Sequence, residues 1–303
     1  MKVLIGGGTG FVGRHLVKQL SSRGHEVIIV SRQNAPGQMT WTDIQSAGLP
    51  EHTGAVVNLA GQLLMDPMSR WNEGFKEKLR NSRIETTSIF AKAIQEAKQP
   101  PRVFVGSSAV GYYPTSETKQ YTENDVCPPT DFMTQLTVDW EKASELPPTC
   151  PTRRVVVRIG VVLGRYGGVI QNLIVPFWLG LGGRISTGNQ WFPWVHVEDV
   201  AGIFMHAIEN KNVEGILNAT APHPITNKEF TAAFAKALWR PACFPVPEFV
   251  LNLVFGAERA EVMTKGQRVI PQRTLESGYE FKYPEIVAAC KEFSHIAPKK
   301  LTF

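Results

Sequence analysis

The sequence predicts an α/β fold of the Rossmann type, a doubly wound parallel sheet, with a smaller C-terminal α/β subdomain. In the first half of the chain, short β-branched runs alternate with longer amphipathic stretches, which is the pattern of βαβ units. The short runs are almost entirely apolar, as expected of parallel strands that helices cover on both faces. A glycine-rich turn joins the first run directly to the first amphipathic stretch. Together these observations predict an open parallel sheet.

The individual elements follow from the same pattern. The apolar runs predict strands at Lys2–Ile5, Glu26–Val30, Ala55–Asn58, Arg102–Val105 and Arg154–Arg158. The amphipathic stretches predict helices at Gly10–Ser22, Trp71–Ala97 and Phe132–Ser144, with a shorter apolar helix around Ile170–Leu179. Two consecutive prolines, Pro100 and Pro101, end the longest helix before the next strand.

A change in pattern divides the chain near residue 240. After about residue 165 the alternation loosens, so the first domain, residues 1–240, is expected to carry insertions on its substrate side. Residues 241–303 are rich in proline and aromatic side chains, and they predict a small appended subdomain. Ligands of open α/β sheets bind at the carboxyl ends of the strands. The subdomain is therefore expected to close over a ligand there.

Composition narrows the class of protein. With 43% hydrophobic and 19% charged residues, the chain is globular and not disordered. No apolar run reaches the ~20 residues that span a bilayer, and glycines interrupt the apolar N-terminus too early for a signal peptide. We expect no membrane partner and a cytoplasmic location, and import into an organelle stays open.

Charge and cysteine content exclude further partners. The net charge is +5 and the basic residues are dispersed, so an anionic small molecule explains the charge better than a nucleic acid does. The four cysteines lie far apart and form no CxxC pair. We therefore expect free thiols in a reducing compartment and no metal site. A homodimer is left open.

The turn after the first strand has the spacing of a phosphate-binding loop. Its glycines, Gly7, Gly10 and Gly13, would let the backbone approach a pyrophosphate closely and let helix and strand pack closely. The helix that follows offers unpaired N–H groups and a partial positive charge. We expect the cofactor pyrophosphate to contact Gly7, Thr9, Gly10, Phe11 and Val12.

The end of the second strand indicates which dinucleotide is bound. An NAD site would place an acidic residue there for the ribose 2′-hydroxyl, but no acid occurs between Glu26 and Asp43. Arg32 offers a permanently charged fork for a 2′-phosphate instead, and Ser31 offers a hydroxyl donor. The alternative is a solvated surface arginine. The sequence thus predicts NADP(H) as the cofactor.

The ordered motifs resemble the extended, epimerase-like branch of the short-chain dehydrogenase/reductase superfamily. The motifs lie at residues 55–61, 103–112, 157–164 and 194–201. The C-terminal stretch, with the segment Gly266–Pro271, is similar to the small domain of an atypical "epimerase family protein" subgroup. The resemblance covers nearly the whole chain and implies an NADP-dependent oxidoreductase or epimerase-like activity.

The resemblance also implies several cofactor contacts. The backbone at Asn58, Leu59 and Ala60 would line the adenine and ribose side, and Ile159 and Gly160 would lie beside the nicotinamide. The subgroup places an arginine, here Arg83, within reach of the cofactor phosphates, and Lys78 would assist it. The alternative for both cations is a solvated helix face.

The catalytic pattern of the superfamily is incomplete. Active members pair a serine with a Tyr-x-x-x-Lys motif, but Met133 and Thr137 occupy those positions when Glu141 is aligned with the family's glutamate. Ser108, together with Tyr112 or Tyr113, is then expected to orient a substrate carbonyl. The alternatives are a strand-end hydrogen bond for the serine and loop packing for the tyrosines.

Other polar and aromatic candidates have structural interpretations as well. Ser107 is a further polar candidate at the end of the fifth strand, and His196 is expected to be a satisfied core residue rather than a catalyst. Asp199 is expected to help cap the helix that begins there. The aromatic residues either line an apolar substrate pocket or pack in the core: Trp178, Trp191, Phe192 and Trp194. Two functions stay open, an enzyme with an unknown carbonyl or sugar-nucleotide-like substrate and a non-catalytic NADP(H)-binding regulator.

Overall fold

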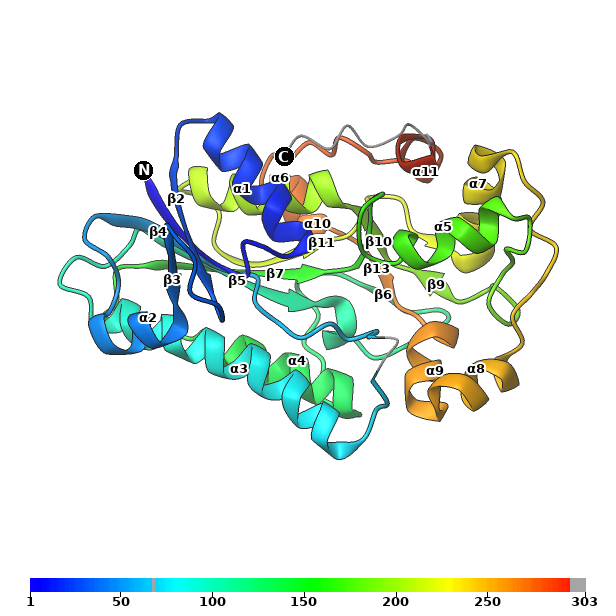
Figure 1. Cartoon of the computed structure of the whole chain (residues 1–303), viewed down its shortest axis with the longest axis horizontal. Helices are drawn as coiled ribbons and strands as arrows, with labels where there is room; N and C mark the ends of the chain where they lie inside the picture. The colour runs from blue at the N-terminus through cyan, green and yellow to red at the C-terminus, as the bar shows by residue number, and fades with distance from the viewer. Residues whose placement is uncertain (67–68, 295–303) are drawn as a thin grey trace.

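A parallel sheet of seven strands forms the centre of the computed structural model, which describes residues 1–66 and 69–294 (Figure 1). The strands are β1 (Lys2–Gly6), β2 (Glu26–Ser31), β3 (Gln38–Thr40), β4 (Thr53–Asn58), β5 (Val103–Ala109), β7 (Arg153–Ile159) and β11 (Gly215–Ala219). Across the sheet their order is β3-β2-β1-β4-β5-β7-β11, and each neighbouring pair is parallel. The predicted Rossmann-type sheet is confirmed.

Helices cover both faces of this sheet (Figure 1). One face carries α1 (Phe11–Ser22) and α6 (Val197–Glu209), and the other carries α2 (Trp41–Ala47), α3 (Glu73–Gln95) and α4 (Phe132–Ala143). Alternate residues of β1 face opposite layers: Val3 and Ile5 belong to the core under α1 and α6, whereas Leu4 packs in the cluster of Phe90 on α3. Burial of both faces explains why the strands are apolar throughout.

The predicted long helices agree with the structure to within two residues at each end. Two neighbouring elements had no sequence signal strong enough to predict them, the edge strand β3 and the short helix α2. Thr40 begins α2 through a reciprocal capping box with Asp43. Elements this short carry too few periodic residues to stand out.

The second half of the chain adds a separate aromatic core beside the sheet. It is formed by α5 (Ile170–Trp178), α7 (Asn227–Leu238) and α11 (Ile286–Ser294). Phe177, Phe234 and Phe293 pack together there, and Trp194 is buried among them. Short strand pairs connect this core to the sheet: β8 (Val161–Leu163) with β10 (Trp194–His196), and β9 (Trp191–Phe192) with β12 (Ile225–Thr226).

The segment from residue 241 onward packs against the first domain at several places. Its elements are α8 (Glu248–Phe255), α9 (Ala257–Thr264), β13 (Arg268–Val269), α10 (Gln272–Glu276) and α11. Strand β13 pairs in parallel with β6 (Gln120–Tyr121), and α10 packs against β11. The domain boundary near residue 240 stays a prediction. Within the described part of the chain, no helix is long and apolar enough to cross a membrane.

Candidate functional site

The site lies at the carboxyl ends of the neighbouring strands β1 and β4. From β1 the chain continues toward β2 on one side of the sheet, and from β4 it continues toward β5 on the other side. The chain turns after β1 at Gly7, and it turns after β4 at Leu59. The two turns are joined because Leu59 N donates to Gly6 O at 2.8 Å. In doubly wound sheets a ligand binds at such a switch point.

The glycine turn has the geometry that was expected of it. Gly7 has a φ of +77°, and a Cβ there would lie 2.7 Å from the Leu59 carbonyl carbon. A Cβ at Gly13 would lie 2.3 Å from Gly7 O, so only glycine lets α1 pack this closely on the turn. Gly10 precedes α1, and neither a side-chain cap nor an acidic residue in the first turn neutralises the helix N-terminus. An anion would be stabilised there.

The side chains around this helix start point in different directions. Thr9 is exposed, whereas Val12 packs inward against the core. The Phe11 ring lies so close to Gly164 and Gly167 that a Cβ on either glycine would come within 2.9 Å of it. Phe11 and Val12 can therefore meet a phosphate only through their backbone N–H groups, while their side chains fix the start of α1.

Asn58 holds the second turn from below. Its side chain is fully buried, its Nδ2 donates to Thr87 Oγ1 at 2.8 Å, and its Oδ1 accepts from Ala60 N at 3.0 Å. The amide thus ties the backbone at Leu59 and Ala60 to α3. The sequence motif placed these residues beside the cofactor, and in the structure they adjoin the glycine turn.

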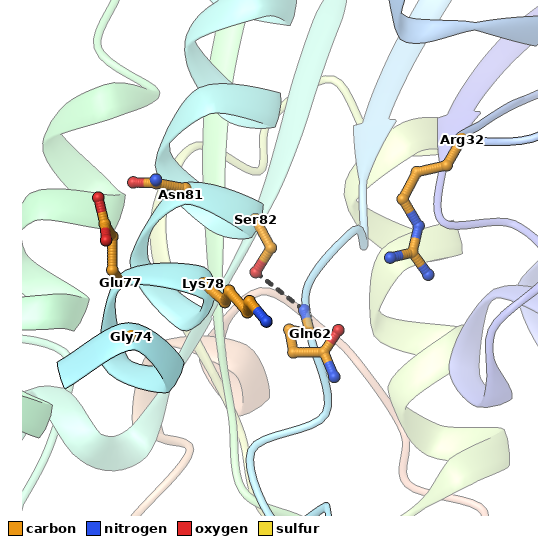
Figure 2. A pocket seen from close by; sticks show the side chains of 7 residues that line it. All are labelled: Arg32, Gln62, Gly74, Glu77, Lys78, Asn81 and Ser82. Atoms are coloured by element: carbon orange, nitrogen blue, oxygen red, sulfur yellow. Dashed lines mark hydrogen bonds between the residues drawn. The ribbon is translucent and has the colours of Figure 1, made fainter. Parts of the chain in front are cut away.

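A pocket of about 470 Å³ lies between the residue that follows β2, the loop after β4 and the first turns of α3 (Figure 2). Its lining residues are Arg32, Gln62, Gly74, Glu77, Lys78, Asn81 and Ser82. Arg32 approaches from the end of β2, and Lys78 approaches from α3. Within residues 1–66 and 69–294, no hydrogen bond or ion pair engages either cation. Two unpaired cations on one pocket favour an anionic group such as a phosphate.

Ser31 and Arg83 have structural partners of their own. The Ser31 hydroxyl donates to Gln33 O at 2.6 Å, so its proton is already used in a hydrogen bond within the turn after β2. The Arg83 guanidinium donates to Gln62 O at 2.9 Å and to Leu79 O at 3.1 Å, and burial lowers the pKa of Arg83 to about 10. Arg83 therefore supports the loop after β4 from below, and its contact with phosphates stays a prediction.

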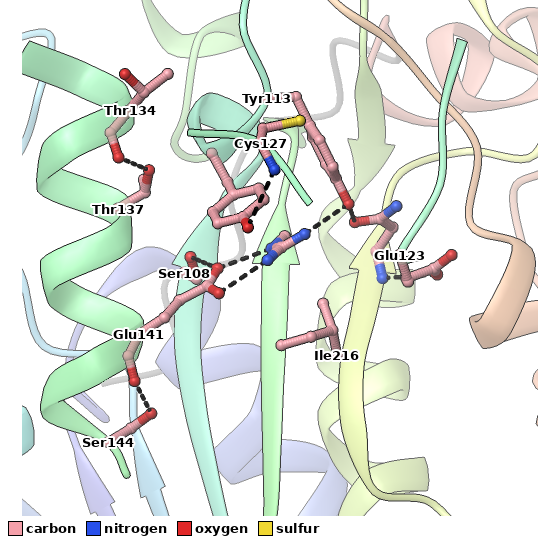
Figure 3. A network of polar contacts seen from close by, with 12 residues as sticks. Ser108, Tyr113, Glu123, Cys127, Thr134, Thr137, Glu141, Ser144 and Ile216 are labelled. Carbon is pink, nitrogen blue, oxygen red and sulfur yellow. Dashed lines mark hydrogen bonds and ion pairs between the residues drawn. The ribbon is translucent and has the colours of Figure 1, made fainter. Parts of the chain in front are cut away.

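A buried polar network lies at the carboxyl ends of β5 and β7 (Figure 3). Arg158 donates to both carboxylate oxygens of Glu141, from Nε to Oε1 at 2.7 Å and from its terminal nitrogen to Oε2 at 2.9 Å. Ser108 donates to the same Oε1 at 2.7 Å and is 1% exposed. Burial opposes the charge of Arg158, but Glu141 outweighs this effect and raises the pKa of Arg158. The Ser108 proton is thus bound to a carboxylate.

The two tyrosines differ in their availability. Tyr113 is fully buried, its hydroxyl contacts Arg158 and Asn218, and burial raises its pKa to about 12. Tyr112 is half-buried, and the centroid of its ring lies 3.3 Å from the Arg158 guanidinium carbon. The Tyr112 hydroxyl accepts a long bond from Cys127 N at 3.4 Å, so its own proton is available to donate. Of these groups, Tyr112 is the better placed proton donor.

The positions of the missing catalytic pair also lie at this site. Met133 and Thr137 on α4 would be the nearest neighbours of a Cβ added to Gly111, one residue before Tyr112. The Thr137 hydroxyl donates within its own helix, to Met133 O and Thr134 O. The alignment that placed the family's tyrosine and lysine at these positions is therefore spatially reasonable, and neither side chain can supply an ammonium or a phenol.

The residues expected beside the nicotinamide continue β7. Ile159 ends β7 against the core under α1, and Gly160 N donates to Ala219 O at 3.0 Å. A Cβ on Gly160 would lie 2.1 Å from Pro193 O, so this position requires glycine. The segment therefore packs tightly behind the end of the sheet.

His196 is a satisfied core residue, as expected, but the role predicted for Asp199 was wrong. His196 is 1% exposed and caps α6 itself, because its Nδ1 accepts from Glu198 N. Asp199 lies inside the first turn of α6, where its carboxylate accepts from Lys282 N at 2.6 Å and from Tyr283 N at 3.0 Å. It therefore fixes the loop before α11.

The aromatic candidates divide between core and surface. Trp194 is buried in the core of α5 and α7, and Phe192 stacks on Phe230. Trp178 is 45% exposed. Trp191 donates from Nε1 to Glu117 O at 2.7 Å and lies under Arg268. Core packing accounts for Trp194 and Phe192, whereas Trp191 contacts the loop at Glu117 and the C-terminal segment at Arg268.

Sequence reasoning did not identify the pair of Glu141 and Arg158 or the lining residues Gln62 and Ser82. One signal was present, since Arg158 interrupts an otherwise apolar central strand and a buried charge requires a partner. Gln62 and Ser82 carry no signal of their own, because the pocket arises only when α3 folds back on the loop after β4. Among the described residues, no group of His, Cys, Asp and Glu could hold a metal ion.

The parallel sheet, the glycine turn and the uncapped α1 define the class of Rossmann-type nucleotide-binding proteins. The chain belongs to the NAD dependent epimerase/dehydratase family, whose model matches residues 3–219. A second model, described as "Domain of unknown function (DUF1731)", matches residues 246–293. The family resemblance predicted from the motifs is therefore confirmed.

Relatives match the chain over nearly its full length. The human "Epimerase family protein SDR39U1" is 49% identical over 96% of this chain and 99% of its own. "Epimerase family protein YfhF" of Bacillus subtilis (strain 168) is 36% identical over 99% of both chains. A crystal structure of human SDR39U1 (isoform2) with NADPH superimposes with a TM-score of 0.95, covering 97% of this chain and 99% of that one at 48% identity.

Proposed function

We propose that the protein binds NADPH at the glycine turn, with the 2′-phosphate between Arg32 and Lys78. The observation that carries this proposal is the pocket that both unpaired cations line, between the end of β2 and the first turns of α3. Two charge-assisted contacts on one side of the pocket suit a phosphate dianion better than a ribose hydroxyl. The human relative whose structure contains NADPH supports the same cofactor.

We further propose that the protein is an NADPH-dependent oxidoreductase or epimerase-like enzyme acting on a carbonyl or sugar-nucleotide-like substrate. The reduced nicotinamide would supply a hydride to a carbon that bears an oxygen. Tyr112 would donate a proton to that oxygen, since its hydroxyl proton is available, and Arg158 under its ring would stabilise the negative charge left on the phenol. Ser108 would orient the oxygen after turning away from Glu141.

A second candidate function is a non-catalytic NADPH-binding regulator. It is favoured by Met133 and Thr137, which stand where a catalytic tyrosine and lysine would be, and by the Glu141 carboxylate that holds the Ser108 proton. A regulator would need cofactor binding and a change in its partner contacts, but no proton transfer.

One screen separates the two candidates. After calorimetry has established NADPH binding, NADPH consumption is followed by absorbance over a panel of carbonyl compounds. A second panel, of sugar nucleotides, is incubated with the protein and NADP(H), and their epimers are detected by chromatography, because an epimerisation consumes no cofactor. An enzyme turns over at least one compound, and Tyr112→Phe slows that turnover. Tight NADPH binding without turnover of any compound on either panel favours the regulator. Failure to bind NADPH contradicts both.

We also propose a reducing compartment, the cytoplasm, as the working location. The four cysteines are free thiols, and Cys243 is exposed to solvent. An exposed thiol without a disulfide partner is typical of reducing surroundings. Fractionation of cells that express a tagged full chain tests this location, and an organellar pool would contradict it.

A further inference from the structure

The segment Gly266–Pro271 brings the C-terminal part of the chain to the polar network. Gln267 Nε2 donates to Tyr113 O at 3.0 Å, and Ser116 N donates to Gly266 O at 3.1 Å. Gly266 packs so tightly that a Cβ there would lie 1.9 Å from Trp191 O. These contacts fix the backbone that leads into Arg268 beside the loop from Tyr113 to Ser116.

The Arg268 side chain is held by stacking and not by polar partners. Its guanidinium carbon lies 4.9 Å from the centroid of the Trp191 ring, and the Nε atom is buried without a hydrogen-bond partner. In the part of the chain that the structure describes, no ion pair or hydrogen bond engages this guanidinium. Buried donors in folded proteins nearly always have an acceptor, so the missing acceptor at Arg268 is significant.

Other arginines of the region have the partners that Arg268 lacks. Arg158 is paired with Glu141, and Arg273 donates to Asn124 Oδ1 and Ile216 O. Arg259, which is 3% exposed, also has an Nε without a partner, but its two terminal nitrogens donate to the backbone oxygens of Asp66 and Ser69. Arg268 differs from these arginines because its guanidinium is held in place by Trp191, yet no described residue accepts a hydrogen bond from it.

We propose that Arg268 binds the anionic group, a carboxylate or a phosphate, of the substrate. A guanidinium presents a planar fork to such a group, and stacking on Trp191 fixes the fork in advance. The carbonyl of the same substrate would then lie toward Tyr112. This inference rests on the proposed function and specifies its substrate class: carbonyl compounds that carry a negative charge.

The test measures anion binding to the protein saturated with NADPH, so that the cofactor occupies its own phosphate sites. Inorganic phosphate and malonate are titrated by calorimetry, and they distinguish a phosphate-bearing from a carboxylate-bearing substrate. We expect one of them to bind with a millimolar Kd and Arg268→Gln to weaken it at least tenfold. Arg268→Lys keeps the charge but loses the planar fork, so its anion Kd should lie between those of the unaltered protein and Arg268→Gln.

Three measurements keep this test decisive. Lys265→Gln, three residues earlier, removes an exposed cation paired with Glu261 and should leave the anion Kd unchanged. The NADPH Kd of Arg268→Gln should equal that of the unaltered protein, and its unfolding midpoint shows that it folds. Binding of neither anion, or equal anion binding by Arg268→Gln, overturns the inference. If NADPH itself does not bind, the proposed function fails. The anions are then titrated into the cofactor-free protein, and the ratio of the anion Kd of Arg268→Gln to that of the unaltered protein still tests the role of Arg268.

Discussion

Glu141 of α4 and Arg158 of β7 form a bidentate ion pair that is almost completely buried, with side chains 11% and 4% exposed. The pair joins a helix to the centre of the sheet directly behind Ser108 and Tyr112. Removing one charge leaves the other desolvated without compensation. The stability of the fold and the order of the site therefore depend on the same contact.

We expect Glu141→Gln to destabilise the protein by about 3–5 kcal/mol, because it leaves the buried Arg158 without its counter-charge. Urea unfolding measures the change. The control is Asp139→Asn on the same helix, which removes a more exposed ion pair with Arg80 and should cost roughly 0–1 kcal/mol. Equal losses of unfolding free energy in the two variants would show that the buried pair stabilises the fold no more than the exposed pair does.

Arg32→Ala should remove most of the preference for NADPH over NADH. A charge-assisted contact with a phosphate is worth on the order of 1.5–3 kcal/mol, roughly ten- to a hundred-fold in Kd. Calorimetric titration of both cofactors measures this ratio. Lys18→Ala, at an exposed cation on α1, should leave the ratio unchanged. Equal affinity of the unaltered protein for the two cofactors would rule out the proposed 2′-phosphate site.

Two glycine substitutions should separate binding from folding. A Cβ on Gly10 meets only Gly7 O, at 3.2 Å, and Gly10 has an ordinary φ of −71°, so Gly10→Val should fold. Its branched side chain should project where the pyrophosphate binds and abolish NADPH binding. Gly13→Val should instead destabilise the fold by about 1–3 kcal/mol or more, because its Cβ would lie 2.3 Å from Gly7 O. Normal NADPH binding by Gly10→Val would mean that the phosphate site lies elsewhere.

Glu198 should make stability sensitive to acid. Hydrogen bonds from His15 above all, and from Gln19, lower the pKa of Glu198 to about 2. A carboxylate with a lowered folded pKa stabilises the protein above its unfolded pKa of ~4.3, and this contribution disappears as the pH falls toward 2. After solvent screening it is on the order of 1–2 kcal/mol.

The measurement compares urea unfolding of Glu198→Gln and the unaltered protein from pH 6 downward, roughly to pH 2. The two curves should differ near neutral pH and converge in acid. The control, Glu209→Gln, removes an ion pair with Arg23 at the other end of α6. A constant difference at every pH would exclude titration of Glu198 as the cause.

The sequence was sufficient where chemistry depends on neighbours along the chain. Gly7, Gly10 and Gly13 must follow a strand and begin a helix, so their spacing predicted the turn, and its contact with a pyrophosphate stays a prediction. Arg32 was readable for the same reason, since it directly follows the second strand, where a cofactor ribose is expected. These features follow from local backbone requirements that a motif records.

The rest of the site depends on contacts between distant segments. Glu141 and Arg158 meet only because the chain folds α4 against the sheet, and the segment of Arg268 lies beside the loop after Tyr113 only because β13 pairs with β6. Asp199 was assigned to a cap because its position fits one, but His196 takes that role once Lys282 and Tyr283 offer their N–H groups to Asp199. Tertiary contacts decided these roles, and no local pattern contains them.

The last prediction concerns catalysis by Tyr112 and Ser108. With Thr137 in the place of a lysine, the Arg158 guanidinium under the ring assists the phenol, but no lysine ammonium at that position of α4 does. Turnover should therefore be slow, and faster in the reductive direction, where Tyr112 gives up its proton. Tyr112→Phe should lower kcat by about a hundredfold or more. Ser108→Ala should lower it less, because the serine must first leave Glu141.

Both variants should bind NADPH with unchanged Kd, since neither residue lines the pocket of Arg32 and Lys78. The control is Tyr121→Phe, a buried tyrosine of the same cluster, which should turn over the substrate at the original rate. Steady-state rates with the substrate found in the NADPH screen measure all three variants. If Tyr112→Phe and Ser108→Ala both keep the original rate, the proton comes from another group and the catalytic assignment is wrong. A loss of rate in Tyr112→Phe alone would keep the tyrosine as the donor and leave Ser108 as a residue that only positions Glu141 and Arg158.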